Sequence, residues 1–441
     1  MKNELFEYME KIKMLFNAND YESVINYFKK IVDNSHFNSS YIVSLVAASY
    51  IKVNRPLEFI DAYKILPSNL KNNSFVLNNL CWCYYHGVIK AYDYKNVDEF
   101  ERFLKIAEYI INNSYIEGGD NNFKTPYVLT VFKVVKVYKL KPSKNYREIL
   151  RWLDKVDKEQ LSDVCYEFVD VGGNNRELSS YKEKYYQYMS EAYEKTEDYV
   201  NCVKCCETAF KSDIKWHYRN GKWLCSRKLY CECIINNGDK KYLNKYRLFA
   251  YKENEWFMYS KLSDLYFRYN LPTDALIYGL KAILACKEKE MLVKVFMNVG
   301  MLLRNFGKKH DSKIFFQACA YYRYQNGWKF SEELEYILNV ENIDYTLKPS
   351  FDYIVQYVKN YLKKEAPYVL EHSGIITDII IEKSFGYIKC NNDKIYFNFR
   401  DLNFKNMKIL EDDKVSFRIE IDDKNRKNAK NVRIIKNGSS N

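Results

Sequence analysis

The chain has 441 residues, 47% of them apolar and 29% charged, which argues against a disordered protein and predicts two or three folded units. Glycine (14) and proline (7) are scarce, which argues against glycine-rich α/β enzymes and β-sandwiches and favours a mostly helical chain. The net charge of +12 permits a polyanionic partner without demanding one, and no apolar run is long enough to predict a membrane span.

Residues 1–340 predict one helix after another. Apolar residues recur there at three- and four-residue spacing, which places them on one buried helical face. Short polar breaks separate the helices at residues 17–20, 53–56, 196–198, 236–239, 270–273 and 306–309. Asp239, Thr273 and Lys308 mark successive breaks that are 34 and 35 residues apart. A period near 34 predicts stacked helical hairpins, an all-α solenoid.

These hairpins resemble tetratricopeptide repeats. Three units match the packing positions of that family, with Tyr186, Met189, Tyr193, Cys202 and Ala209 in one, Tyr259, Leu262, Tyr266, Ala275 and Ala282 in the next, and Phe296, Val299, Gly300, Leu303, Gly307, Phe316 and Cys319 in the last. The first hairpin, near Asp20, matches more weakly. The resemblance implies repeats in residues 1–112 and 183–340, with a concave groove that holds protein partners.

Residues 113–182 depart from the repeat pattern. Turn residues predict an irregular helical insert with two longer loops there: Gly118, Gly119, Pro126, Pro142, Gly172 and Gly173. Helical patterns cover residues 98–112 and 127–140. Residues 341–367 predict a helical linker whose last helix lies at 351–364.

The character of the sequence changes in residues 368–441. Short β-branched or aromatic runs alternate there with polar turns, at residues 375–376, 379–381, 395–397, 415–419 and 432–435. Five short strands in about 70 residues predict a small all-β barrel.

Two of these strands carry aromatic residues at alternate positions. Alternation puts Phe385 and Tyr387 on one face of the first strand, and Tyr396 and Asn398 on one face of the second. A hairpin between the strands would join the three rings into an exposed platform. Such rings stack on nucleic-acid bases, each stack being worth about 1–3 kcal/mol, while neighbouring lysines follow the phosphates. Alternation alone fits an ordinary barrel core equally well.

Residues 372–436 resemble a cold-shock domain. Residues 383–388 stand where the family has the form Lys-Gly-Phe-Gly-Phe-Ile, and residues 395–399 where it has Val-Phe-Val-His-Phe. The first, fourth and fifth strands match at residues 374–376, 414–417 and 428–432. The resemblance implies an oligonucleotide-binding-type (OB-type) barrel whose ligand is single-stranded RNA or DNA, with RNA preferred. A related S1-type barrel is the alternative.

The resemblance also implies roles for single residues. Those expected to stack on bases are Phe385, Tyr387, Tyr396 and Phe399, and those expected to make polar contacts are Lys383, Lys394 and Asn398. Simple alternation instead places Phe399 inward. Asp378 stands where the family has a stacking tryptophan, and Ser384 replaces a glycine. These departures predict weaker affinity or a changed ligand.

Three basic stretches could extend this surface. The last strand and tail contain Lys424, Arg426, Lys427, Lys430, Arg433 and Lys436. The other two lie at residues 124–147 and 215–228. A solvated helix face explains the two helical stretches better, whereas for the C-terminal stretch both explanations stand equal.

The sequence contains no catalytic or metal-binding motif. Cys202, Cys205 and Cys206 fall within a helical pattern, as do the pairs at 81/83 and 231/233, and zinc ligands are usually paired at a turn. Phosphate-binding glycine loops are absent. We therefore expect no cofactor, no metal and no enzyme. Twelve cysteines without an apolar leader segment predict reduced thiols and a cytoplasmic location.

Together these features give two hypotheses. The first is a non-enzymatic adaptor whose barrel binds single-stranded RNA and whose solenoid binds protein partners. The alternative is a pure protein-interaction scaffold or regulator whose barrel does not bind nucleic acid, for example an accessory of a mobile-element or phage-defence system. Asp378 and the modest net charge motivate the alternative.

Overall fold

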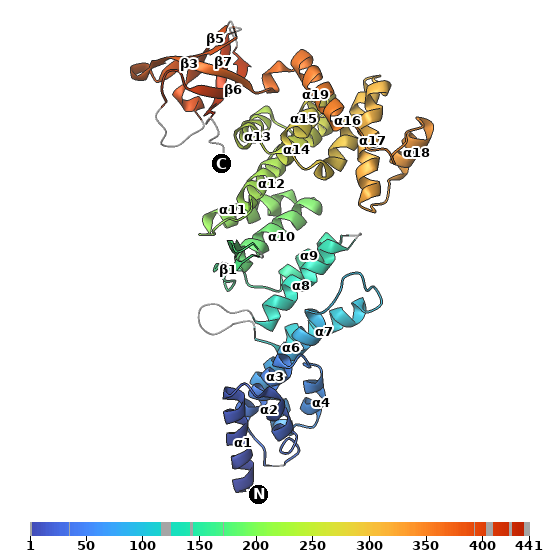
Figure 1. Cartoon of the computed structure of the whole chain (residues 1–441), viewed down its shortest axis with the longest axis vertical. Coiled ribbons are helices and arrows are strands. Elements are labelled where there is room, and N and C mark those ends of the chain that lie inside the picture. The colour runs from blue at the N-terminus through green and yellow to red at the C-terminus, as the bar shows by residue number, and fades with distance from the viewer. Residues whose placement is uncertain are drawn as a thin grey trace. The chain divides into compact units, whose positions relative to one another are not determined.

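The computed structural model describes residues 2–34, 36–115, 125–141, 144–170, 172–391, 393–402, 409–422 and 426–435. The chain divides into two compact units, Met1–Arg227 and Lys228–Asn441. Helices dominate both units, and a closed β-barrel follows the helices of the second (Figure 1). The prediction of a helical solenoid followed by a small barrel is confirmed. Among the described helices, none is long and apolar enough to cross a membrane.

The first unit consists of helices and one small sheet. Its helices are α1 (Lys2–Asn17), α2 (Tyr21–Phe28), α3 (Ser40–Lys52), α4 (Glu58–Lys64), α5 (Ser68–Lys71), α6 (Ser74–Tyr84), the π-helix η1 (Tyr85–Ile89), α7 (Phe100–Asn113), α8 (Pro126–Leu140), α9 (Tyr146–Leu153), α10 (Tyr181–Lys195), α11 (Tyr199–Lys211) and α12 (Asn220–Ile235), which runs on into the second unit. The sheet is an antiparallel hairpin of β1 (Tyr166–Val169) and β2 (Asn175–Leu178).

This hairpin lies inside the predicted irregular insert and was not predicted from the sequence. Gly172-Gly173 between two short runs was a turn signal, but the strands are short and polar. The two helical stretches predicted at 98–112 and 127–140 are confirmed as α7 and α8. Gly118, Gly119 and Pro142 lie outside the described residues.

The second unit has helices α13 (Lys240–Glu253), α14 (Trp256–Arg268), α15 (Pro272–Ala285), η2 (Lys289–Leu292), α16 (Val293–Asn305), α17 (Lys309–Gln325), α18 (Glu332–Val340), α19 (Phe351–Glu365) and η3 (Pro367–Val369). Its barrel has β3 (His372–Ile380), η4 (Ile381–Lys383), β4 (Phe385–Cys390), β5 (Asp393–Asn398), η5 (Phe399–Asp401), β6 (Lys414–Ile421) and β7 (Lys427–Ile434). The last helix predicted at 351–364 is α19.

The six predicted breaks share one backbone geometry. Each contains a residue in the left-handed region, with φ between 49° and 76°, namely Asn19, Asn54, Glu197, Asn237, Asn270 and Gly307. The N–H group of the next residue donates to the carbonyl oxygen five residues back, at 2.8–2.9 Å in all six. This is the Schellman turn, which favours glycine and asparagine. The regular spacing of the breaks therefore reflects a repeated helix–turn–helix unit.

An aspartate begins the next helix in several breaks. Asp198 accepts the backbone N–H of Asn201 at 3.2 Å and its side-chain amide at 2.8 Å. We expect Asp198→Ala to lower the free energy of unfolding by about 1 kcal/mol, because the first turn of α11 loses this acceptor. Urea unfolding measures the change. Asp213→Ala, at an exposed aspartate outside the helices, should stay within about 0.5 kcal/mol, and equal losses would contradict a capping role.

The barrel closes in the order β3-β4-β5-β7-β6, and β6 pairs back to β3. Every neighbouring pair is antiparallel except β5 and β7. Alternating residues fill the interior as predicted, including Ile388, Ile395 and Phe397. This closed five-stranded arrangement is the OB-type barrel expected from the sequence.

The barrel packs on α13 and α14 through β6 and β7. Arg418 of β6 is only 2% exposed, and its Nη2 donates to the carbonyl oxygen of Tyr251 at 3.1 Å and to the hydroxyl of Tyr259 at 2.9 Å. Its guanidinium lies 4.1 Å from the ring centre of Tyr251. Asn431 of β7 donates to the same carbonyl at 3.1 Å. These contacts use β6 and β7, and not the strands that carry the aromatic residues.

Candidate nucleic-acid interface

Three aromatic rings lie together on the outer face of β4 and β5. The ring centres of Phe385 and Tyr396 are 5.3 Å apart, those of Phe385 and Tyr387 5.8 Å, and those of Tyr387 and Tyr396 6.0 Å. The strand register causes this, because Tyr387 pairs directly with Tyr396. All three side chains are half-buried. Their planes meet at 39° to 89°, so the rings form a cluster with faces in several directions and not one flat platform.

Lysines extend the same face beyond the rings. Lys389 follows Phe385 and Tyr387 at the alternate position on β4 and pairs with Lys394 on β5, and both lysines are exposed. Lys383 is exposed in η4, immediately before β4. Sequence reasoning missed Lys389, although the alternation rule that selected the rings also selects it. Cations therefore stand at both ends of the ring cluster, as a phosphate backbone crossing the two strands requires.

Asp378 of β3 is paired with a lysine of this face. Its Oδ2 lies 2.9 Å from Nζ of Lys394, which is itself 4.8 Å from the ring centre of Tyr387. Hydrogen bonds from Lys394 and then Thr377 lower the pKa of Asp378, so the carboxylate stays ionised. Because this pair is open to solvent, it is weak, and a phosphate can compete for Lys394.

Asn398 and Phe399 are placed differently from the rings. Asn398 caps η5, where its Oδ1 accepts the N–H of Arg400 at 3.0 Å, so this oxygen is already used. Its Nδ2 lies 3.5 Å from the hydroxyl of Tyr396 and faces the cluster. Phe399 packs against the barrel core, with its ring centre 6.2 Å from that of Phe397. The structure thus puts Phe399 on the core side that simple alternation indicated.

The basic edge at the C-terminal strand is largely paired. The ion pairs are Arg426 with Asp422, Lys427 with Asp393, and Lys430 with Asp401. Arg433 donates to the carbonyl oxygen of Lys252 on α13. Lys424 and Lys436 lie outside the described residues. The pairs of Arg426 and Lys427 are about as open to solvent as the pair of Asp378 and Lys394, so a phosphate can compete for these cations as well.

The two basic helical stretches also use charges inside the fold. Lys139 on α8 pairs with Glu191 at 2.6 Å, and Arg227 on α12 pairs with Glu194 at 2.9 Å. Lys124 lies outside the described residues. These two basic side chains are therefore used inside the fold and are not part of a solvated face.

The cysteines considered as metal ligands are poorly suited to that role. Cys202 and Cys206 are fully buried in α11, and burial raises the pKa of Cys205 to about 12. All three cysteines lie on one helix, and among the described residues they belong to no group of three converging metal-ligating side chains. A different cysteine, Cys165, lies beside a histidine and a carboxylate far away in sequence, which spacing rules could not reveal.

Comparisons with known proteins give likenesses of fold. No family model and no curated protein matches the chain. Among solved structures it is similar to the C-terminal part of a TPR repeat-containing protein from Cytophaga hutchinsonii, with 14% identity, a TM-score of 0.30, and coverage of 69% of this chain and 98% of that one. A tetratricopeptide repeat protein from Parabacteroides merdae has 11% identity and a TM-score of 0.29, with coverage of 76% of this chain and 97% of that one. The TPR domain of P58(IPK) has 10% identity and a TM-score of 0.24, with coverage of 82% of this chain and 99% of that one. No residue role is carried over from these structures.

Proposed function

We propose that this chain is a non-enzymatic, cytoplasmic adaptor that binds single-stranded RNA on the outer face of β4 and β5 and protein partners along its helical hairpins. The ring cluster of Phe385, Tyr387 and Tyr396 is the observation that carries the RNA-binding half. Three rings gathered on the outside of a barrel have no packing role in its core. Bases stack on such rings with little dependence on sequence.

The charge around the cluster supports the same proposal. Lys383 and Lys389 are exposed at its two ends, and Lys394 makes a solvent-exposed pair with Asp378 and lies over the ring of Tyr387. Phosphate contacts by these lysines would make binding weaken as salt is raised.

A groove in the second unit supports the protein-binding half. It is lined by residues of α14 and α16 and by Glu333 of α18, and has a volume of about 270 Å³. Phe267, which is 58% exposed, and Met301 offer apolar contacts there, while Asn298 donates to Asp264 at 3.0 Å on the polar side. A mixture of apolar walls and a few fixed polar groups suits a side chain of a bound polypeptide.

Fluorescence anisotropy with the full chain tests RNA binding. The probe is a labelled oligouridine of about 12 nucleotides, a length that one barrel of this kind covers. We expect Tyr387→Ala to weaken binding by about 1–3 kcal/mol, or roughly 5- to 150-fold, because one stacking ring is lost. A deoxythymidine probe of the same length separates RNA from DNA preference.

Tyr336→Ala is the matched control, since Tyr336 is a 63% exposed tyrosine on α18, away from the barrel. It should leave the affinity unchanged. No binding of either probe at low salt, or equal losses for Tyr387→Ala and Tyr336→Ala, would reject the RNA-binding half and favour a pure protein-interaction scaffold.

A further inference from the structure

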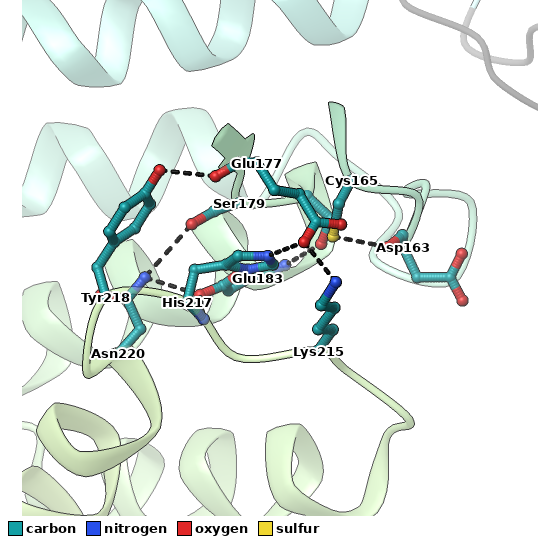
Figure 2. Close-up of polar contacts among 10 residues, drawn as sticks. Asp163, Cys165, Glu177, Ser179, Glu183, Lys215, His217, Tyr218 and Asn220 are labelled. Atoms are coloured by element: carbon teal, nitrogen blue, oxygen red, sulfur yellow. Dashed lines mark hydrogen bonds and ion pairs between the residues drawn. The ribbon is translucent and has the colours of Figure 1, made fainter. Parts of the chain in front are cut away.

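A sulfur, a nitrogen and an oxygen ligand converge in the first unit. Cys165 comes just before β1, Glu177 lies on β2, and His217 lies between α11 and α12. One ligand atom of each residue lies within 4.8 Å of the other two. Figure 2 shows His217 between the carboxylates of Glu177 and Glu183, with Cys165 beside Glu177. The β1–β2 hairpin and the segment before α12 therefore build one site.

His217 is held in a fixed orientation by Glu183. Oε2 of Glu183 lies 2.6 Å from Nδ1 of the ring, and Oε1 accepts the backbone N–H of His217 at 2.9 Å. Asn220 also donates to Oε1 at 2.7 Å, and Glu183 is fully buried. A carboxylate on Nδ1 places the proton there and leaves the lone pair on Nε2, which is how metal-binding histidines are usually oriented.

The Nε2 atom is buried and aimed into the site. The His217 side chain is only 9% exposed, and among the described residues Nε2 has no hydrogen-bond partner. It lies 3.2 Å from Oε2 of Glu177. A tetrahedral zinc ion with nitrogen and oxygen ligands at about 2.0–2.2 Å separates those two atoms by about 3.3–3.6 Å. The two ligand atoms therefore need to move apart by only a few tenths of an ångström to hold one ion.

Hydrogen bonds join the end of β2 to the segment that carries His217, and they form without any ion. The hydroxyl of Tyr218 donates to the carbonyl oxygen of Glu177 at 2.6 Å. Asn220 donates to the hydroxyl of Ser179 at 3.4 Å. These bonds keep Glu177 facing His217, so the protein has little rearrangement to make on binding an ion.

We propose that Cys165, Glu177 and His217 bind one Zn²⁺ ion. Zinc accepts sulfur, nitrogen and oxygen ligands together, and a site with three protein ligands leaves a fourth position for water. Binding releases the thiol proton of Cys165, so the thiolate and the carboxylate balance the charge of the ion. Lys215 contacts Oε2 of Glu177, so its 65% exposed side chain would have to turn into solvent when the ion binds. The competing arrangement is a protonated His217 that pairs with both carboxylates and binds no ion.

Metal titration of the full chain tests the site. After treatment with a chelator, Zn²⁺ alone is added and followed by calorimetry, with Co²⁺ as a spectroscopic substitute. We expect one ion per chain, a cobalt–thiolate charge-transfer band, and a thermal midpoint raised by about 5 °C or more at saturating zinc. Cys165→Ser should abolish the band, and His217→Gln should weaken binding at least about 10-fold.

Two further variants make the result specific. Cys205→Ser is the matched control, because Cys205 lies on α11 outside the group and should keep both band and affinity. Glu183→Gln should weaken binding by about 10- to 100-fold and keep the band, since Glu183 positions His217 and touches no metal. If a variant fails to fold, protection of Cys165 from alkylation by Zn²⁺ in the unaltered chain gives the same answer. The proposal would be overturned, in favour of the protonated histidine, if Zn²⁺ gave no protection and Co²⁺ gave no charge-transfer band. It would also be overturned if Cys205→Ser lost both signals while Cys165→Ser kept them.

Discussion

Replacing Arg418 with alanine should lower the free energy of unfolding of the second unit by about 3 kcal/mol. The variant loses hydrogen bonds from a charged donor to Tyr251 and Tyr259, and the contact between the guanidinium and the Tyr251 ring. It also loses a longer hydrogen bond to Asn254 at 3.5 Å and an ion pair with Glu371 at 3.8 Å. Such bonds contribute about 1.5–3 kcal/mol each, and a desolvated cation–ring contact about 2 kcal/mol. The cost of burying the charge of Arg418 opposes these contributions. This cost is raised because Nε and Nη1 of Arg418 have no hydrogen-bond partner among the described residues. The expected net loss is therefore smaller than the sum of the contacts.

Urea unfolding followed by tryptophan fluorescence measures this change. Trp256 begins α14, between the two tyrosines that contact Arg418, and residues 368–441 contain no tryptophan. Limited proteolysis should also cut the variant faster near residues 366–371, where the helices lead into the barrel. Arg418→Met should lose less stability than Arg418→Ala, because it keeps most of the buried volume.

Arg426→Ala is the control for loss of a positive charge. Arg426 pairs with Asp422 at the β6–β7 turn and its side chain is 69% exposed, so its removal should change stability by less than about 1 kcal/mol. Equal effects of Arg418→Ala and Arg426→Ala would mean that the contacts of Arg418 do not stabilise the packing of the barrel on α13 and α14.

Features set by neighbouring residues could be predicted from the sequence. The helix breaks depend on local turn chemistry. Asparagine or glycine takes the left-handed position in five of the six breaks, and aspartate caps the next helix in three. Asn19 and Asp20 therefore mark a break without knowledge of the rest of the chain. The barrel interior follows from alternation, which correctly placed Ile388 and Phe397 inside.

Contacts between distant residues could not be predicted. Arg418 and Tyr251 are 167 positions apart, and nothing in a basic strand residue shows whether it meets a phosphate or a buried carbonyl. The same holds for Cys165, Glu177 and His217, whose convergence depends on a hairpin with weak strand signals. Composition gave the number of charges, and only the fold shows which of them are paired.

The face of β4 and β5 depends on a glycine behind the rings, so Gly386→Ala should destabilise the barrel strongly. Gly386 is buried between Ile379 of β3 and Phe397 of β5. A Cβ atom there would lie 2.5 Å from the carbonyl oxygen of Asp378 and 2.7 Å from the ring of Phe397. The carbonyl oxygen of Asp378 is a backbone atom and the ring of Phe397 belongs to the barrel core, so displacing either of them costs free energy. We expect a loss of about 3 kcal/mol or more, the upper range for overpacking.

Ser384→Gly gives the opposite change at the start of the same strand. Ser384 has a φ of 53°, a left-handed conformation that costs a residue with a Cβ about 1–2 kcal/mol. Glycine removes that cost, although the larger conformational entropy that glycine has in the unfolded chain offsets part of the gain.

Hydrogen exchange of the β3 and β4 amides measures both variants. Gly386→Ala should speed exchange and weaken oligouridine binding, because the strand that carries Phe385 and Tyr387 is displaced, whereas Ser384→Gly should slow exchange and keep binding. Unchanged exchange in Gly386→Ala would contradict the close approach of β3 and β4. Faster exchange with unchanged binding would separate the barrel fold from the proposed RNA surface.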